Sequence, residues 1–399
     1  MKTSRLIFPA GLSVSLALTG SHALAQGSLT PPGPPAPTMK TLSQVEPRIP
    51  ISSAPYTISQ PGSYYLTTNL TSTGHGVVIT TDSVVLDLNG FSMTGDRDST
   101  DYGLYVVGAS NAPLRNIVVR NGCIANFGSG VRFDCALNSR IQDLCISSNS
   151  SYGVYLYGQS GQCNGNTIAN CSISGNRGSG VYLNGQSGQC DGNTIANCSI
   201  SGNGASGVYL NGYSSGQCDG NTIANCSISG NGNCGVFLFG TSGKCNGNTI
   251  ADCSISGNSN YGVCLDGSFS GQCNGNTIAD CSISGNGNYG VYLYGYSGQC
   301  DGNSIARCVI RNNTVYGIYL RYADGNRVEE NHTTGTTGSP SYGIFSSSTT
   351  QNLILRNTCV GQTNNFSLSA NDTYGPIVTN SGELATTGAA AHPWANFSR

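Results

Sequence analysis

Short apolar segments with a period of two recur along the central part of the chain. Val154 and Leu156 alternate with Tyr155 and Tyr157, and the phrase Gly-Val-Tyr-Leu returns after each Gly- and Asn-rich corner. A period of two is typical of a β-strand with one buried face. Helix is disfavoured because no 3.6-residue period is present and Gly or Asn interrupts the pattern at short intervals. The pattern predicts three short strands in each unit.

The units are near copies of one another. Each reads Gly-Val-Tyr-Leu, a Gly/Ser loop, Cys-Asn/Asp-Gly-Asn-Thr-Ile-Ala-Asn/Asp-Cys and Ser-Ile-Ser-Gly-Asn. Short strands that turn at Asn/Gly corners and repeat in this way predict a coil that stacks each unit on the one before it, which is a parallel β-helix. The second cysteine marks the period, with spacings of 27, 28, 27, 28 and 27 residues between Cys171, Cys198, Cys226, Cys253, Cys281 and Cys308.

This repeat resembles that of the right-handed parallel β-helix repeat family, a pectate-lyase-like architecture that also includes periplasmic proteins of the nitrous-oxide-reductase copper-insertion type. The phrases Asn-Thr-Ile-Ala-Asn, Ile-Ser-Gly-Asn and Gly-Val-Tyr-Leu carry the resemblance over roughly residues 75–370. It implies an all-β right-handed parallel β-helix solenoid, and the aligned repeats predict about 10–11 coils with three short strands per coil. It leaves the activity open, because one fold hosts many functions. The low number of His and Met residues argues against the copper-associated role.

The pattern also divides the chain into segments. The first segment has a positively charged start, a short apolar stretch and a small-residue cleavage site, which indicate secretion. We therefore expect the protein to be secreted, periplasmic or at the cell surface. The ends of a solenoid expose strand edges, so capping segments are expected on both sides of the repeats. The predicted segments are a signal peptide (1–25), a Pro-rich linker (26–50), an N-terminal cap (51–74), the parallel β-helix (75–370) and a C-terminal cap or tail (371–399).

Composition and charge argue against nucleic acid and membranes as partners. Charged residues make up 9% of the 399 residues and the net charge is −2, whereas soluble domains carry about 25% charged residues. The chain therefore has no electrostatic footprint for nucleic acid or for an anionic membrane. After the signal segment, no apolar run is long enough to span a bilayer. We expect neither nucleic acid nor a membrane span, and the oligomeric state is left open.

Twelve of the 18 cysteines fall into two columns of six when the coils are aligned. Neighbouring coils lie ~4.8 Å apart, which allows either disulfide bridges between coils or stacked reduced thiols. We favour stacked thiols with scattered bridges. Cys123 and Cys145 align on neighbouring coils and are the leading disulfide candidate. The ligand spacings of zinc sites are missing, so no metal site is predicted.

Aromatic residues form a column after each Gly-Val dipeptide, and a second column lies two residues further on. Such a strip suits a polysaccharide, because ring faces stack on the apolar faces of sugars while Asn and Asp bond their hydroxyl groups. Stacked rings can also simply stabilise the strands, and both interpretations stay open. The candidate carbohydrate-binding residues are Tyr155, Tyr157, Tyr182, Tyr209, Phe237, Tyr292, Tyr294 and Tyr319.

The scarce charges gather in the last coils. One column, which begins with Asn or Asp in its first five coils, continues as Asp252, Asp280, Arg307, Glu330 and Arg356. In a lyase, an arginine can neutralise a uronate carboxylate while a neighbouring acidic residue abstracts a proton, and this column offers both kinds of residue. Ca²⁺ at Asp252 and Asp280 is considered only under that alternative, and no other cofactor is expected. An ion-pair ladder would explain the same residues without chemistry.

Motifs of enzymatic relatives are mostly missing. Polygalacturonases carry Asn-Thr-Asp, paired aspartates, Gly-His-Gly and Arg-Ile-Lys, of which only Gly74-His75-Gly76 occurs here. A weaker charged cluster that includes His75 and Asp101 is expected to be a solvated loop.

The leading hypothesis is a secreted or surface-associated rod that binds or organises extracellular polysaccharide without catalysis. The alternative is a polysaccharide lyase or glycoside hydrolase that acts at the C-terminal charged cluster. Its candidate catalytic residues are Asp252, Asp280, Arg307 and Glu330.

Overall fold

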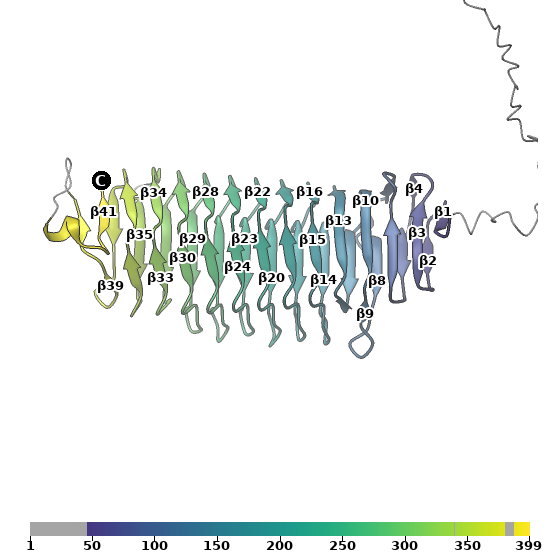
Figure 1. Ribbon diagram of the computed structural model, residues 1–399, viewed down its shortest axis with the longest axis horizontal. Coiled ribbons are helices and arrows are strands. Elements are labelled where there is room, and N and C mark those ends of the chain that lie inside the picture. The colour runs from purple at the N-terminus through teal and green to yellow at the C-terminus, as the bar shows by residue number, and fades with distance from the viewer. Residues whose placement is uncertain (1–45, 339, 380–386) are drawn as a thin grey trace, which may run out of the picture. The chain divides into compact units, whose positions relative to one another are not determined.

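Successive units of the chain stack in register as parallel strands (Figure 1). The computed structural model describes residues 46–338, 340–379 and 387–399. The chain divides into the units Met1–Pro47 and Arg48–Arg399, and the solenoid is the second of these. One of its sheets has 13 strands and another has 26. The predicted all-β parallel solenoid with three strands per turn is confirmed, with about 11 turns.

The 13-stranded sheet takes its strands from successive turns and from the capping segments at the two ends, and it forms one wall of the solenoid. Its strands are β2 (Tyr56–Ile58), β5 (Val77–Ile79), β8 (Tyr102–Val107), β11 (Ser129–Asp134), β14 (Val154–Tyr157), β17 (Val181–Asn184), β20 (Val208–Asn211), β23 (Val236–Phe239), β26 (Val263–Asp266), β29 (Tyr289–Tyr294), β32 (Tyr316–Arg321), β35 (Tyr342–Ser347) and β38 (Asn364–Ser367).

The 26-stranded sheet contains two rows, because each turn bends at a corner between two short strands. The first row comprises β1 (Ile49–Ile51), β3 (Gly62–Leu66), β6 (Val84–Asp87), the first parts of β10 (Val118–Ala125) and β13 (Arg140–Ser147), β15 (Thr167–Ala169), β18 (Thr194–Ala196), β21 (Thr222–Ala224), β24 (Thr249–Ala251), β27 (Thr277–Ala279), β30 (Ser304–Ala306), β33 (Arg327–Glu329), β36 (Leu353–Leu355) and β39 (Thr373–Tyr374).

The second row follows that corner and completes the turn. It comprises β4 (Leu70–Thr71), β7 (Ser92–Thr94), the second parts of β10 and β13, β16 (Ser172–Ser174), β19 (Ser199–Ser201), β22 (Ser227–Ser229), β25 (Ser254–Ser256), β28 (Ser282–Ser284), β31 (Val309–Arg311), β34 (His332–Thr334), β37 (Thr358–Val360) and β41 (Asn396–Ser398), which also pairs with β40 (Ile377–Val378). A small sheet joins β9 (Leu114–Arg115) to β12 (Ala136–Leu137), and a 3-10 turn, η1, covers Gly388–Ala391.

The segments predicted to flank the repeats also contribute strands. β2 and β4, within the predicted N-terminal cap, pair in register with β5 and β7. Ile49 and Pro50, at the end of the predicted linker, belong to β1. β39, β40 and β41 extend the 26-stranded sheet from the predicted C-terminal tail. The predicted signal peptide and residues 26–45 of the linker lie outside the described residues.

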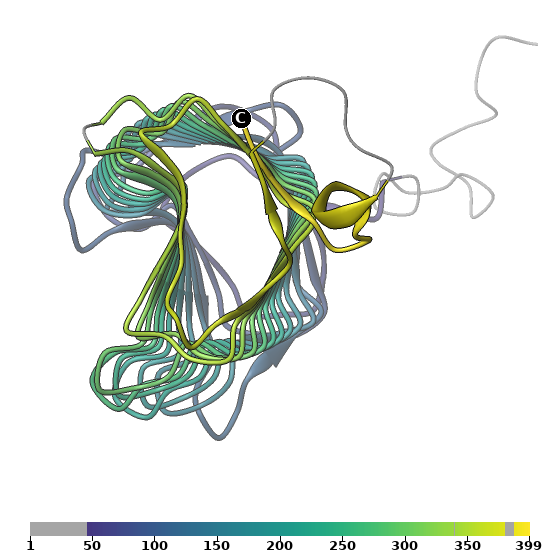
Figure 2. The same ribbon diagram turned by 90° about the vertical axis from the view of Figure 1, so that its left-hand side faces the viewer.

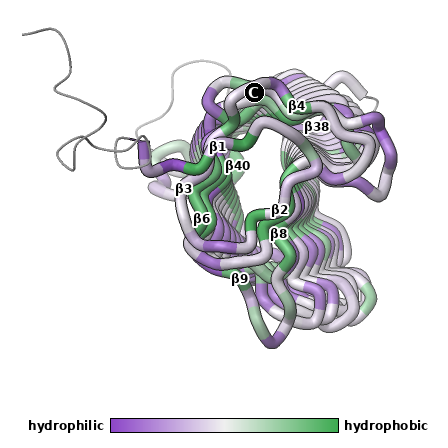
Figure 3. Tube along the Cα trace, turned by 90° about the vertical axis from the view of Figure 1, so that its right-hand side faces the viewer, coloured by the Kyte–Doolittle hydropathy of each residue, from purple (hydrophilic) through white to green (hydrophobic). Residues whose placement is uncertain are grey.

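The core is one continuous stack of aliphatic side chains. In a representative turn Val154 and Leu156 point inward from the 13-stranded sheet, while Ile168 and Ile173 meet them from the two rows of the other sheet. Viewed along the axis, the turns superpose closely (Figure 2). Hydrophobic segments of β6 and β8 lie across the interior from each other (Figure 3). Burial of each such side chain contributes about 1.5–3 kcal/mol.

Both columns of six cysteines line this core. Cys163 heads the first column and Cys171 the second, and all twelve thiols are buried within the aliphatic stack. All 18 cysteines are free thiols in the structure. Small apolar side chains suit these corners, where two walls of the solenoid converge.

Buried asparagines at one corner form a continuous hydrogen-bonded chain, which we call the asparagine ladder. Each Nδ2 group donates to the Oδ1 atom of the next member at 3.0–3.1 Å, and that Oδ1 atom also accepts the preceding member's backbone N–H. The ladder ends at the carboxylate of Asp372. Its members are Asn166, Asn193, Asn221, Asn248, Asn276, Asn303, Asn326 and Asn352.

Candidate functional site

The outer surface of the 13-stranded sheet, which we call the aromatic face, carries in-register columns of side chains. Val154 and Leu156 point into the core, so the residues between and after them point outward. The middle column consists of Tyr105, Arg132, Tyr155, Tyr182, Tyr209, Phe237, Cys264, Tyr292, Tyr319 and Phe345. The third column consists of Asp134, Tyr157, Asn184, Asn211, Phe239, Asp266, Tyr294, Arg321 and Ser347.

Rings of the middle column stack on one another. The centroids of Tyr155 and Tyr182 are 5.1 Å apart with planes 9° from parallel, and those of Tyr209 and Phe237 are 5.1 Å apart at 7°. Tyr182 is only 7% exposed as a result. The candidate binding residues of this column stay a prediction, but stacking limits how much of their ring faces a ligand could contact. Within the stack, neighbouring rings cover the ring faces, so the ring edges and hydroxyl groups are the parts that a ligand could contact.

Amides of the third column hold the tyrosine hydroxyl groups. Asn184 Nδ2 donates to the Tyr155 hydroxyl at 3.1 Å, and Asn211 Nδ2 donates to the Tyr182 hydroxyl at 2.7 Å. Burial raises the pKa of both tyrosines, against a smaller lowering by these hydrogen bonds. The hydroxyl groups stay neutral at physiological pH and can donate to a neutral acceptor.

A further aromatic column was missed because the inward and outward alternation breaks at a glycine. A Cβ atom on Gly153 would lie 2.5 Å from Ile173 Cγ2, inside the core, and the next residue, Val154, is also buried. Two successive residues therefore face inward, and Tyr152 turns outward to contact the ring of Tyr182 at 4.8 Å. The aromatic members of this first column are Tyr102, Tyr152, Tyr261, Tyr289, Tyr316 and Tyr342.

An arginine takes the place of a ring near the amino end of the aromatic face. Arg132 Nε donates to Asp134 Oδ1 at 2.7 Å, and its Nη1 donates to the Tyr102 hydroxyl at 2.6 Å. The Tyr105 hydroxyl donates to Asp134 at 2.8 Å. The Arg132 guanidinium also lies 5.1 Å from the ring centroid of Tyr155. The Arg132 guanidinium therefore takes the position in the stack that an aromatic ring holds in neighbouring turns.

His75 and Asp101, expected in a solvated loop, are ordered beside this cluster. His75 Nδ1 accepts the Tyr102 backbone N–H at 3.1 Å and lies 3.3 Å from the Asp101 carboxylate. Its ring stacks on that of Tyr102 with centroids 5.2 Å apart. The pair therefore belongs to the edge of the aromatic face.

The four candidate catalytic residues occupy successive corners between the two rows of the 26-stranded sheet. The backbone there is left-handed, with φ of 54° at Asp252, 56° at Asp280, 53° at Arg307 and 57° at Glu330. Asn and Asp adopt this conformation more readily than other non-glycine residues. Backbone geometry therefore explains why Asn fills this column in other turns.

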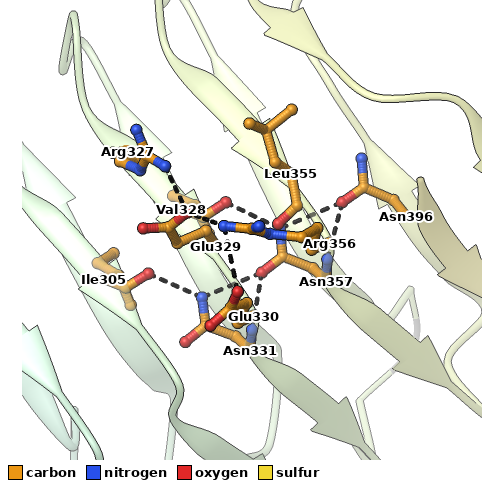
Figure 4. A network of polar contacts seen from close by, with 10 residues as sticks. All are labelled: Ile305, Arg327, Val328, Glu329, Glu330, Asn331, Leu355, Arg356, Asn357 and Asn396. Carbon is orange, nitrogen blue, oxygen red and sulfur yellow. Dashed lines mark hydrogen bonds and ion pairs between the residues drawn. The ribbon is translucent and has the colours of Figure 1, made fainter. Parts of the chain in front are cut away.

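Ion pairs link two sets of neighbouring corners, Asp280 with Arg307 and Glu330 with Arg356. Arg307 donates to both oxygens of Asp280, at 2.8 and 2.7 Å. Arg356 lies 2.9 Å from Glu329 and 3.1 Å from Glu330 (Figure 4). The Arg307–Asp280 and Arg356–Glu330 pairs are exposed, whereas Glu329 is only 15% exposed, and all of them lie on the 26-stranded sheet rather than on the aromatic face. The structure thus brings the charges together as neighbours along the solenoid.

Over residues 46–338, 340–379 and 387–399, no three His, Cys, Asp or Glu side chains are grouped so that they could hold a metal ion. No helix in the same ranges is long and apolar enough to cross a membrane.

Comparison with known proteins places the chain in a family. The model described as "Right handed beta helix region" matches residues 67–218, 163–301 and 244–382, which together span most of the chain. The chain belongs to this right-handed β-helix family. No curated protein sequence matches it.

Solved structures share the fold at low sequence identity. The Agl-KA catalytic domain aligns with a TM-score of 0.55 and 15% identity, over 77% of this chain and 62% of that one. PfbA, a surface adhesin of Streptococcus pneumoniae, aligns with a TM-score of 0.52 and 13% identity, over 77% and 84%. The A-module of the mannuronan C-5 epimerase AlgE4 from Azotobacter vinelandii aligns with a TM-score of 0.50 and 18% identity, over 73% and 91%. At these identities the likeness concerns the fold.

Proposed function

We propose that this protein is an exported, non-catalytic rod that binds polysaccharide along its aromatic face. The observation that carries the proposal is the in-register run of rings and amides over successive turns of one wall. A glycan chain is itself a repeating polymer, and a regular solenoid repeats its contacts at ~4.8 Å intervals. Neutral hydroxyl and amide groups suit sugar hydroxyl groups, which need both donors and acceptors.

Contacts at the edge of the stack fit this role better than contacts in its middle. Tyr157 and Tyr294 are half-buried third-column residues, each packed against a middle-column ring, at 5.4 Å from Tyr155 and 5.6 Å from Tyr292. Their remaining surface is open to a ligand lying along the wall. Export to the periplasm, the cell surface or the medium, which the N-terminal segment suggests, would bring the rod to such polymers.

Binding of the purified full-length mature chain to an array of neutral and acidic glycans tests the proposal. Tyr157→Ala and Tyr294→Ala should each weaken binding roughly tenfold, since an aromatic contact contributes about 1 kcal/mol or more. Tyr213→Ala is the matched control, because this exposed loop tyrosine lies off the wall. If the wild-type protein bound no glycan, a purely structural or adhesive rod would replace the proposal.

The same glycans separate binding from catalysis. Release of unsaturated or reducing ends, with and without Ca²⁺, should not occur. Turnover that disappears in Arg307→Asn or Asp280→Asn would instead support the lyase or hydrolase alternative at the corner column. Asn is chosen as the replacement because it adopts the same left-handed corner conformation at Asn170, Asn197 and Asn225.

A further inference from the structure

Between Tyr155 and Phe345, the middle column holds a Tyr or Phe ring in every turn except that of β26. In the turn of β26 the middle column holds Cys264, and in the turn of β23 the first column holds Cys234. Both thiols are buried, at 3% and 1% exposure, and pack against surrounding rings rather than in the main core. A thiol is much shorter than a ring, and a hollow of about 360 Å³ lies over these two residues. We call this hollow the ladder gap.

Aromatic rings border the ladder gap on both sides. Phe237 is the register partner of Cys264 on one neighbouring turn and Tyr292 on the other. Two turns correspond to ~9.6 Å. Tyr292 is only 8% exposed, so neighbouring rings cover most of its surface, and the half-buried Phe237 offers the more open ring to a ligand. Phe237 stacks on Tyr209 with its other side. Tyr261 leans against Tyr292 at 5.2 Å and lines the hollow as well.

Charged and amide groups meet at the same hollow. Asp266 and Arg321 line it from the third column, on the turns before and after Tyr294. The Arg321 guanidinium lies 5.6 Å from the Tyr294 ring centroid and is exposed. Asn260 Nδ2 donates to Asn233 Oδ1 at 3.3 Å on the opposite side of the hollow. Rings, a cation and hydrogen-bonding groups therefore converge on one hollow.

Building on the proposed function, we propose that the ladder gap is a subsite for one sugar residue with an anionic substituent. The sugar residue lies in the hollow against Phe237, and Arg321 binds its carboxylate or sulfate. The planar guanidinium suits both anions because it offers parallel N–H donors. Asp266 accepts from sugar hydroxyl groups, and its charge keeps the anionic group on the Arg321 side. The proposal makes the protein selective for acidic over neutral polysaccharides.

Filling the gap tests the subsite. Cys264→Phe restores the ring that Phe237 and Tyr292 carry at the same column position, so the variant should fold. Its thermal unfolding checks this. We expect binding of polygalacturonate, a carboxylated glycan, and of a sulfated glucan to fall roughly tenfold or more. If Cys264→Phe binds both as tightly as the wild type, the subsite is overturned while glycan binding elsewhere on the face stands.

Removing the cation tests the chemical class. Arg321→Gln should weaken binding of the acidic glycans roughly tenfold and leave a neutral glucan unchanged, and comparison of the two acidic probes shows which anion is preferred. Arg177→Gln, a change of an exposed arginine outside the gap, is the matched control. An equal loss for acidic and neutral glycans would overturn the anionic assignment. Failure of the wild type to bind any glycan would instead overturn the proposed function itself.

Discussion

Asp219 donates its backbone N–H to the Asp191 carboxylate, one turn earlier at the same corner, at 2.8 Å. Other turns place an amide there, as Asn164 does when its Oδ1 atom accepts the Asp191 N–H at the same distance. Burial, together with the nearby Asp219 carboxylate, raises the pKa of Asp191 to about 6. The ordinary value is 3.8, so ionisation of this residue opposes folding.

We therefore predict that Asp191→Asn stabilises the protein only where Asp191 is ionised. The folded state holds the proton more tightly than the unfolded state, so the wild type loses stability as the pH rises from about 4 to about 6. At pH 7.5 the variant should gain on the order of 1 kcal/mol in free energy of unfolding, and at pH 3.5 it should match the wild type. Urea unfolding at both values measures this. An equal gain at the two pH values would contradict the explanation.

The asparagine ladder should be sensitive to a single truncation. Asn248 Oδ1 accepts the Asn221 backbone N–H at 2.8 Å and the Asn221 side chain at 3.0 Å, both in the buried corner. Asn248→Ala leaves these donors without their acceptor and should lower the free energy of unfolding by about 2–4 kcal/mol. Urea unfolding checks the loss, with Ser199→Ala on an exposed strand position as the control. Equal effects of the two changes would argue against the ladder as a source of stability.

Arg132 and Asp134 should behave as a coupled pair. Their side chains are 19% and 9% exposed, and Arg132→Met leaves the Asp134 carboxylate without its cation. The single change should cost about 2–4 kcal/mol, and addition of Asp134→Leu should recover much of the loss. A double-mutant cycle based on chemical unfolding gives the coupling energy. Additive losses would show that the two residues contribute independently.

Cys123 and Cys145 stay our leading disulfide prediction. They are direct register partners on β10 and β13, and both are exposed free thiols in the structure. Burial raises the pKa of Cys123, with the Cys145 neighbour adding to the shift, so formation should be faster at alkaline pH. Treatment with oxidised glutathione, which accepts the two electrons and two protons, should link their peptides in mass spectrometry. Cys123→Ser is the control, and 18 alkylatable thiols after oxidation would contradict the prediction.

The turns and rows were predictable because their cause is local and repeated. Val154, Leu156, Ile168 and Ile173 recur at fixed positions in each unit, so period and alternation alone locate the three inward faces. The Asn-rich corners were visible as well. Their cause, a left-handed backbone at residues such as Asn170, could be assigned only once φ was known.

The aromatic face was only partly predictable, because its chemistry depends on packing between turns. Strict alternation hides Tyr152, since Gly153 and Val154 both face inward. Sequence alignment places Cys264 in the aromatic column, but the hollow above it depends on the rings of neighbouring turns. Arg132 lies before the most regular repeats, so its insertion into the stack carried no repeating signal.

The asparagine ladder also gives the solenoid a chemical direction. Every side-chain amide in it donates toward the carboxy-terminal end, so their dipoles add along the axis as peptide dipoles do in a helix. The positive end of this array meets the buried carboxylate of Asp372, which neutralises it. Whole repeats can be gained or lost in the middle without leaving a donor unmatched, because the last amide still donates to Asp372. The number of repeats can therefore vary, whereas the direction of the amide dipoles along the axis stays the same.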